Sequence, residues 1–147
     1  MKLIRFGAEG SEKPGILVGE KRYDVSSIVT DYNESFFENN GLEKLKSAIE
    51  SGTSFPEVAG DVRLGSPVAR PSKIICIGLN YVDHCHETGA PIPTEPIIFF
   101  KSTTSLCGPN DNVIIPKGSE KTDWEVELAF VVGKKTSYVE EADALDY

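Results

Sequence analysis

Glu125 and Glu127 have the clearest chemical potential in this chain, because a single residue separates them within an apolar run. If residues 123–133 form a strand, both carboxylates lie on one face, roughly 6.7 Å apart along the backbone. Neighbouring carboxylates that lose hydration stay ionised only when a cation or several donors compensate them. Oxygen ligands alone favour Mg²⁺, Mn²⁺ or Ca²⁺ over zinc. The pattern predicts part of a hard-metal site, and the alternative is a strand whose acids face water.

A histidine and a glutamate upstream form a second candidate group. On a helix, His84 and Glu87 lie three residues apart and share a face with Tyr81. A carboxylate beside an imidazole fixes its tautomer and raises its basicity, as a general base for water requires. The alternative is an ordinary surface pair on a solvated helix.

Lys101 is a third candidate, at the end of an apolar run over residues 97–100. A lysine just past a buried aromatic strand can hold an anionic substrate or a developing oxyanion. Many lysines in such positions only extend their ammonium group to water.

These residues must be positioned by short strands and one helix. Residues 73–78 are apolar and end in glycine, which predicts a strand. The following residues, 79–89, predict a short helix with Asn80 as N-cap, Asp83 as its reciprocal acid and Gly89 as the stop. We also expect a buried strand at 97–100, and a strand at 123–133 whose second half is apolar on both faces.

Taken together, three blocks of sequence strongly resemble the fumarylacetoacetate hydrolase family. The blocks are Gly78-Leu79-Asn80-Tyr81 with Asp83-His84 and Glu87, then residues 95–101, then residues 123–129. Their order, spacing and identities match, and the resemblance covers residues 73–147. The leading seventy residues resemble the smaller N-terminal domain of one branch. That branch includes hydrolases of 2,4-diketo-3-deoxy sugar acids, and its members are often labelled ureidoglycolate lyases.

The resemblance implies a role for each candidate residue. Glu125 and Glu127 match two of three carboxylate ligands of a divalent metal, usually Mg²⁺. His84 with Glu87 matches the dyad that activates water, and Lys101 matches a lysine near the keto-acid end of the substrate. The third family ligand is an aspartate in a strand beyond the helix expected near residue 139, past the last residue given. Asp143 and Asp146 are assigned to that helix and not to the metal.

The activity implied is hydrolysis of a C–C bond in a 2,4-diketo acid of the acylpyruvate type, through an enolate that the divalent metal stabilises. Isomerase, decarboxylase and ureidoglycolate lyase activities remain alternatives within the family. A non-catalytic fragment that acts only in assembly or interaction is a further alternative. The expected partners are a small keto-acid substrate and a second copy of the chain in a homodimer.

Composition excludes several other classes of partner. The net charge of −8 argues against nucleic acid and acidic membranes. We find no apolar run near the roughly 20 residues that span a bilayer, and no apolar core of a signal peptide at the N-terminus. The three cysteines are odd in number and lack Cys-x-x-Cys spacing, which favours reduced thiols in the cytoplasm. Consecutive residues on a helix diverge, so His84, Cys85 and His86 cannot converge on one zinc ion.

The predicted fold class is α+β, mostly β, in two parts. Residues 1–68 form a small N-terminal domain, and residues 73–147 form the first part of a β-roll like that of the family, which makes the catalytic domain truncated. Within the first part we expect a strand at 2–6 and a hairpin at 16–25. A capping-box pattern opens a helix at residues 40–43, and the helix runs to Gly52 with Leu42, Leu45 and Ile49 on one side. Residues 51–72 read as a linker around one short strand.

Overall fold

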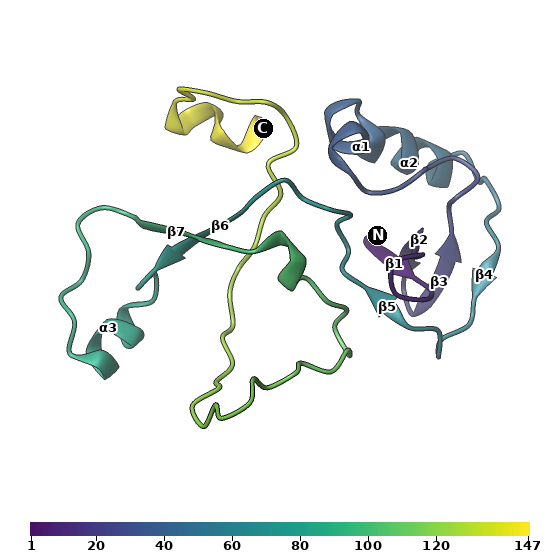
Figure 1. Cartoon of the computed structure of the whole chain (residues 1–147). Helices are drawn as coiled ribbons and strands as arrows, with labels where there is room; N and C mark the ends of the chain where they lie inside the picture. The colour runs from purple at the N-terminus through teal and green to yellow at the C-terminus, as the bar shows by residue number, and fades with distance from the viewer. The chain divides into compact units, whose positions relative to one another are not determined.

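The N-terminal part of the chain folds around a curled, five-stranded antiparallel sheet in the computed structural model, which describes residues 1–147 (Figure 1). The strands are β1 (Lys2–Phe6), β2 (Lys13–Val18), β3 (Lys21–Asp24), β4 (Glu57–Val58) and β5 (Leu64–Gly65). Their order in the sheet is β4-β3-β2-β1-β5, which leaves β4 and β5 at the edges. The predicted strand and hairpin are confirmed: Val18 pairs with Lys21, and Gly19 takes the left-handed φ of 60° that favours glycine in this turn.

Two helices, α1 (Glu34–Glu38) and α2 (Gly41–Glu50), follow the hairpin. The helix predicted from residue 40 to Gly52 is confirmed, but the predicted capping box is wrong. Asn40 lies in the left-handed region with φ 57° and makes no side-chain cap hydrogen bond. An N-cap side chain normally reaches the first turn from extended backbone. Asn33 has that geometry at the start of α1, where its side chain accepts a hydrogen bond from the Phe36 amide.

The core of this part lies between the sheet and the helices. Its buried members come from β2, the loop after β3, α1 and α2: Ile16, Val25, Val29, Tyr32, Phe36 and Leu45. Tyr32 donates a 2.7 Å hydrogen bond from its hydroxyl to the Gly15 carbonyl and stacks edge-on against Phe36. Burial, together with the charge of Asp31, raises the pKa of Tyr32. Leu42 remains 41% exposed, so α2 packs against the core through Leu45 and Ile49 and not through Leu42.

The middle of the chain forms a second unit, Arg70–Leu106, with a two-stranded antiparallel sheet and one helix. Strand β6 (Ile74–Gly78) pairs with β7 (Ile97–Lys101), and α3 (Val82–Thr88) connects them. Both strands and the helix were predicted. The burial predicted for the second strand is wrong: Ile98 is 61% and Phe100 66% exposed, because β7 has a single partner strand and little packs on its faces.

The first unit consists of Met1–Ala69 together with Cys107–Tyr147. The strand predicted over residues 123–133 is not formed, and these residues belong to no helix or strand. A strand requires a neighbour to accept and donate its backbone hydrogen bonds, and no other segment of the chain pairs with this one. The helix expected near residue 139 is a 3₁₀ helix, η2 (Glu141–Asp146).

The chain contains seven strands, three α helices and two 3₁₀ helices, and is therefore mixed α/β and mostly strand. That agrees with the predicted class. The β-roll and the division into domains at residues 68–73 stay predictions. No helix is long and apolar enough to cross a lipid bilayer.

Candidate functional site

His84 and Glu87 lie on α3, as the sequence predicted. The helix begins one residue later than expected: Tyr81 is the N-cap, and neither it nor Asn80 provides a side-chain cap. Cys85 is fully buried, which fixes the inner face of the helix. The His84 Nδ1 atom lies 3.7 Å from Glu87 Oε2, and the two side chains are 55% and 80% exposed. This distance is too long for a hydrogen bond but within reach of one after a small rotation.

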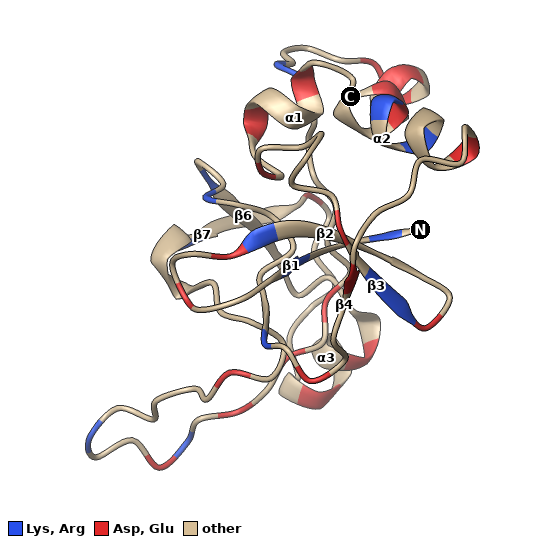
Figure 2. Cartoon of the chain, turned by 90° about the vertical axis from the view of Figure 1, so that its right-hand side faces the viewer, with Lys and Arg blue, Asp and Glu red and all other residues tan.

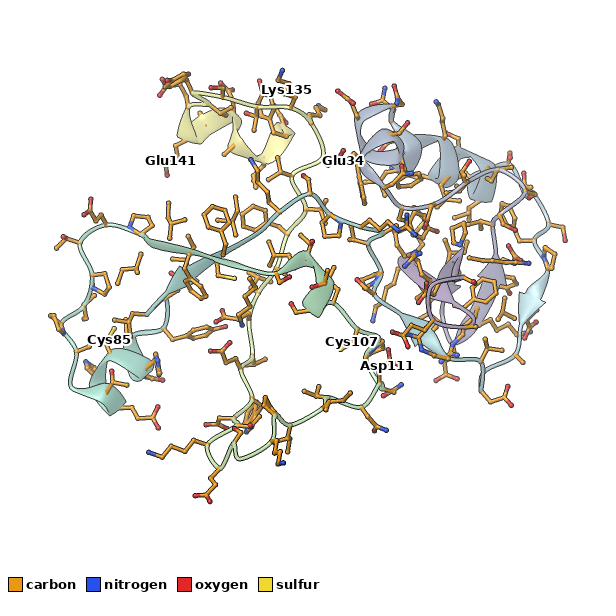
Figure 3. All side chains as sticks on the ribbon, in the orientation of Figure 1. Glu34, Cys85, Cys107, Asp111, Lys135 and Glu141 are labelled. Atoms are coloured by element: carbon orange, nitrogen blue, oxygen red, sulfur yellow. The ribbon has the colours of Figure 1, made fainter.

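The C-terminal end of α3 is also as predicted. Gly89 has the left-handed φ of 66°, and its amide donates to the carbonyls of Cys85 and His86. Thr88 donates a 2.8 Å hydrogen bond from its hydroxyl to the His84 carbonyl. Figure 3 places Cys85 on this short helix. The C-terminal end of the helix that carries the histidine is therefore capped, while the His84 side chain faces solvent.

Lys101 is the last residue of β7 and pairs with Ile74. The chain then turns through η1 (Thr103–Ser105). The Ser102 hydroxyl lies 2.7 Å from that of Thr104 and accepts a hydrogen bond from its amide. The lysine thus stands beside a turn rich in hydroxyl groups. Hydroxyls and an ammonium group are suitable donors for a carboxylate or an oxyanion.

Glu125 and Glu127 are exposed residues of the segment after Cys107. They provide the oxygen donors that a hard divalent cation prefers, and both are accessible, so they fit as part of such a site. No three His, Cys, Asp or Glu side chains of this chain gather around a position where an ion could bind. Neither Asp143 nor Asp146 therefore completes a site with the two glutamates.

The five candidate residues divide between the two units. His84, Glu87 and Lys101 belong to Arg70–Leu106, whereas Glu125 and Glu127 belong to the other unit. His84 and Glu87 are brought together as predicted. The convergence of the two glutamates with His84 stays a prediction. Acidic residues occur on α1, on α3 and along the segments outside the helices and strands (Figure 2).

Sequence reasoning missed an ion-pair network in the first unit. Arg63 pairs with Asp111 at 2.6 Å and with Glu12 at 2.9 Å, and Glu12 lies 3.6 Å from Arg5, which pairs with Asp31. The hydrogen bond from Arg63 lowers the pKa of Asp111 below its ordinary value. Burial raises the pKa of Glu12, but Arg63, backbone amides and Arg5 outweigh it, so the net shift is downward. No spacing rule finds partners 48 and 51 residues apart.

The chain is mixed α/β and carries a histidine–carboxylate pair, a lysine at the end of a strand, and two glutamates separated by one residue. Residues 73–147 match the family model described as fumarylacetoacetate (FAA) hydrolase C-terminal. The chain belongs to the fumarylacetoacetate hydrolase family, which confirms the resemblance found in its sequence.

Curated proteins of similar sequence match the whole chain, and a solved structure matches most of it. A "putative hydrolase" of Burkholderia cenocepacia is 51% identical over 148 residues, covering 100% of this chain and 52% of that protein. A "putative hydrolase" of Burkholderia multivorans has the same identity and coverage. The crystal structure of a "putative HpcE protein" from Mycobacterium smegmatis superposes with a TM-score of 0.63 at 27% identity, covering 81% of this chain and 42% of that one. The chain thus spans about half the length of the curated relatives that it matches.

Proposed function

We propose that the protein hydrolyses a carbon–carbon bond in a 2,4-diketo acid of the acylpyruvate type, with Mg²⁺ as its divalent cation and Mn²⁺ or Ca²⁺ as substitutes. The observation that carries this proposal is the His84–Glu87 pair, 3.7 Å apart on an exposed helix in a chain of this family. The 2,4-diketo-3-deoxy sugar acids are the substrates that we favour within the class.

Each step of the proposed reaction uses a side chain of this protein. His84 takes a proton from water, whose oxygen attacks the C4 carbonyl of the substrate. Glu87 orients the imidazole and stabilises its positive charge. The C3–C4 bond then breaks, which releases a carboxylic acid and the enolate of pyruvate, and C3 regains a proton from the imidazolium. Lys101 holds the substrate carboxylate through its ammonium group.

Glu125 and Glu127 would hold the divalent cation. When bound, the cation supplies Lewis-acid stabilisation to the oxygens of the substrate's dicarbonyl group. The two glutamates support this role by their donor type and their exposure to solvent.

We propose further that the protein acts in the cytoplasm as a homodimer. Its three cysteines form no disulfide, which is compatible with a reducing compartment. Apolar side chains of β7 and of the segment that carries the glutamates are exposed, and a second subunit is one means of covering them.

Product analysis of the full-length protein tests the reaction. An acylpyruvate is incubated in ¹⁸O-labelled water with Mg²⁺, and with EDTA as control. Hydrolysis yields pyruvate and a carboxylic acid that carries one solvent oxygen, and EDTA abolishes turnover. Carbon dioxide release would identify a decarboxylase, and an isomeric product an isomerase. Selective turnover of ureidoglycolate would identify a lyase, so any of these three outcomes contradicts the hydrolytic proposal.

A further inference from the structure

Leu79 has an unusual backbone conformation at the junction between β6 and α3. Its φ of 50° falls in the left-handed region, which glycine and asparagine adopt readily and leucine rarely does. It directly follows Gly78, the last residue of β6, which pairs with Ile97 of β7. A residue held in this region costs free energy and persists only where its surroundings favour it. The chain therefore turns at a costly position just before the helix that carries His84.

One side-chain contact joins this junction to the helix. The Cys85 thiol donates a hydrogen bond to the Leu79 carbonyl, with 3.7 Å between sulfur and oxygen. Cys85 is fully buried and is the only buried residue of α3. A thiol is a weak donor, but this sulfur is inaccessible to water that would otherwise compete for the bond. The left-handed turn at Leu79 thus presents a carbonyl group to the inner face of the helix.

The remaining packing of α3 is sparse, so its direction depends on this junction. All its residues except Cys85 are exposed, and no strand or other helix packs extensively against it. The His84 and Cys85 amides both donate to the Tyr81 carbonyl, at 3.1 and 3.3 Å, so His84 lies in the first turn. Only Asn80 and Tyr81 separate Leu79 from the helix (Figure 1). A change of φ at Leu79 would therefore reorient the helix relative to β6 and move His84 with it.

We propose that Leu79 and Cys85 are positioning residues for the proposed reaction. The left-handed turn at Leu79, held by the Cys85 thiol, sets the direction in which α3 leaves β6 and so fixes the backbone of His84. Cys85 acts through the Leu79 carbonyl and through its peptide bond to His84, and neither residue needs to touch substrate. The catalytic consequence rests on the proposed function, in which His84 is the base, whereas the junction itself does not.

Two substitutions of Leu79 separate backbone conformation from side-chain packing. Leu79→Ile keeps the volume and apolar character but adds a branch at Cβ, which makes the left-handed region far less accessible. Leu79→Asn loses the apolar side chain but suits that region. In full-length protein, Leu79→Ile should lower kcat by about tenfold or more and leave KM within about twofold of wild type, because a misplaced base slows the chemical step. Leu79→Asn should lose no more than about twofold in kcat.

Substitutions of Cys85 test the thiol contact. Cys85→Ala removes the donor and should lower kcat as Leu79→Ile does, whereas Cys85→Ser keeps a donor and should recover most of the wild-type kcat. The amides of residues 85 and 90, which donate to the Tyr81 and Cys85 carbonyls, report on α3 without any assay of activity. In Leu79→Ile and Cys85→Ala they should exchange hydrogen about tenfold faster. Cys76→Ala, which removes a thiol from the middle of β6 in the same unit, is the matched control and should change neither quantity.

Each other outcome overturns a defined part of the inference. A loss of kcat in Leu79→Asn with none in Leu79→Ile would show that the leucine side chain matters and not its backbone conformation. Faster exchange in Cys85→Ala with unchanged kcat would leave a structural contact and remove the positioning role. Exchange equal to wild type in Leu79→Ile and Cys85→Ala would remove the junction as well. A wild-type protein that hydrolyses no acylpyruvate would defeat the proposed function and the positioning role together, while the exchange rates would still decide the junction.

Discussion

At the residue scale, the His84–Glu87 pair is close but not yet hydrogen-bonded. Its 3.7 Å separation and high exposure mean that solvent competes for both groups. Catalytic hydrogen bonds often shorten only when substrate excludes water. Bound substrate should therefore bring the imidazole and the carboxylate within hydrogen-bond distance of each other.

Replacement of the histidine tests its role directly. In full-length protein, His84→Ala should lower kcat by roughly 10²–10⁴ while largely sparing Mg²⁺ binding, because a general base is lost and no ligand is removed. His86→Ala is the matched control, since it removes a second exposed histidine two residues along the same helix. Steady-state kinetics against Mg²⁺ concentration measure both effects. An equal loss of kcat in the two variants would contradict the assignment.

Replacement of a glutamate should affect the affinity for Mg²⁺ and not mainly kcat. Glu127→Ala should weaken Mg²⁺ binding, with part of the activity recovered at high Mg²⁺, because one oxygen ligand is lost. Glu120→Ala, an exposed acid of the same segment, controls for the change in net charge. Isothermal titration with Mg²⁺ or Mn²⁺ gives the affinities. If wild type and Glu127→Ala bind the metal equally well, the ligand assignment is wrong.

The sequence predicted contacts between near residues and missed those between distant ones. His84 and Glu87 follow from helical periodicity, because positions three apart share a face. The partners of Arg63 lie 48 and 51 residues away, and sequence spacing carries no information about such contacts. Charge alone did not separate Asp111 from the many other acids of a chain with net charge −8.

At the scale of elements, helices and strands could be predicted where the residues that pair with them or cap them lie nearby in the sequence. The hairpin of β2 and β3 needs only its own turn, and α2 follows from its apolar spacing and the glycine after it. The predicted strand over residues 123–133 fails for the opposite reason. Its alternation and apolar character suit a strand, but strand geometry is stabilised by a hydrogen-bonded neighbour that this segment lacks.

The packing of α2 makes a prediction about stability. Leu45 is fully buried, so Leu45→Ala should lower the free energy of unfolding of the N-terminal part by about 2–5 kcal/mol, through lost burial and the cavity left behind. Leu42→Ala, on the same helix but 41% exposed, should cost much less. Urea unfolding followed by circular dichroism compares the two. Equal losses would contradict the packing described for α2.

The ion-pair network predicts how the stability of the first unit depends on pH. The folded-state pKa values of Asp111 and Glu12 lie below their ordinary values of 3.8 and 4.5. Their stabilising contribution is therefore present above those ordinary values and is lost as the pH falls through the lowered ones. The melting temperature should fall in that acidic range, and less steeply in Asp111→Asn. Exposed Asp61→Asn is the control, and identical slopes in all three proteins would contradict the network's role.

At the scale of the whole molecule, apolar side chains remain exposed on several segments. Phe100 is 66%, Leu128 90% and Phe130 86% exposed. Apolar surface of this kind favours association, and the open edges of the two-stranded sheet offer unpaired backbone groups. Residues 1–147 expressed alone should therefore form dimers or larger species, and should lack Mg²⁺-dependent turnover because no third ligand joins the two glutamates.

Size-exclusion chromatography with light scattering measures the association, and an acylpyruvate assay measures turnover. Phe100→Lys should shift the same polypeptide toward monomer, because it places a charge on the exposed strand. A well-folded wild-type monomer with full Mg²⁺-dependent activity would contradict both expectations. It would also return Asp143 or Asp146 to consideration as the third ligand.

The position of the only tryptophan has an optical consequence. Trp124 directly precedes Glu125 and is 81% exposed, whereas the aromatic core is built from Tyr32 and Phe36. The emission maximum of Trp124 should be red-shifted, as for indole in water, even in the folded protein. Unfolding of the core should therefore hardly change this emission maximum. The same emission should respond when a cation, a substrate or a second subunit reaches the neighbouring carboxylate. Trp124 emission should therefore report events near Glu125 and Glu127, while it changes little when the core of the protein unfolds.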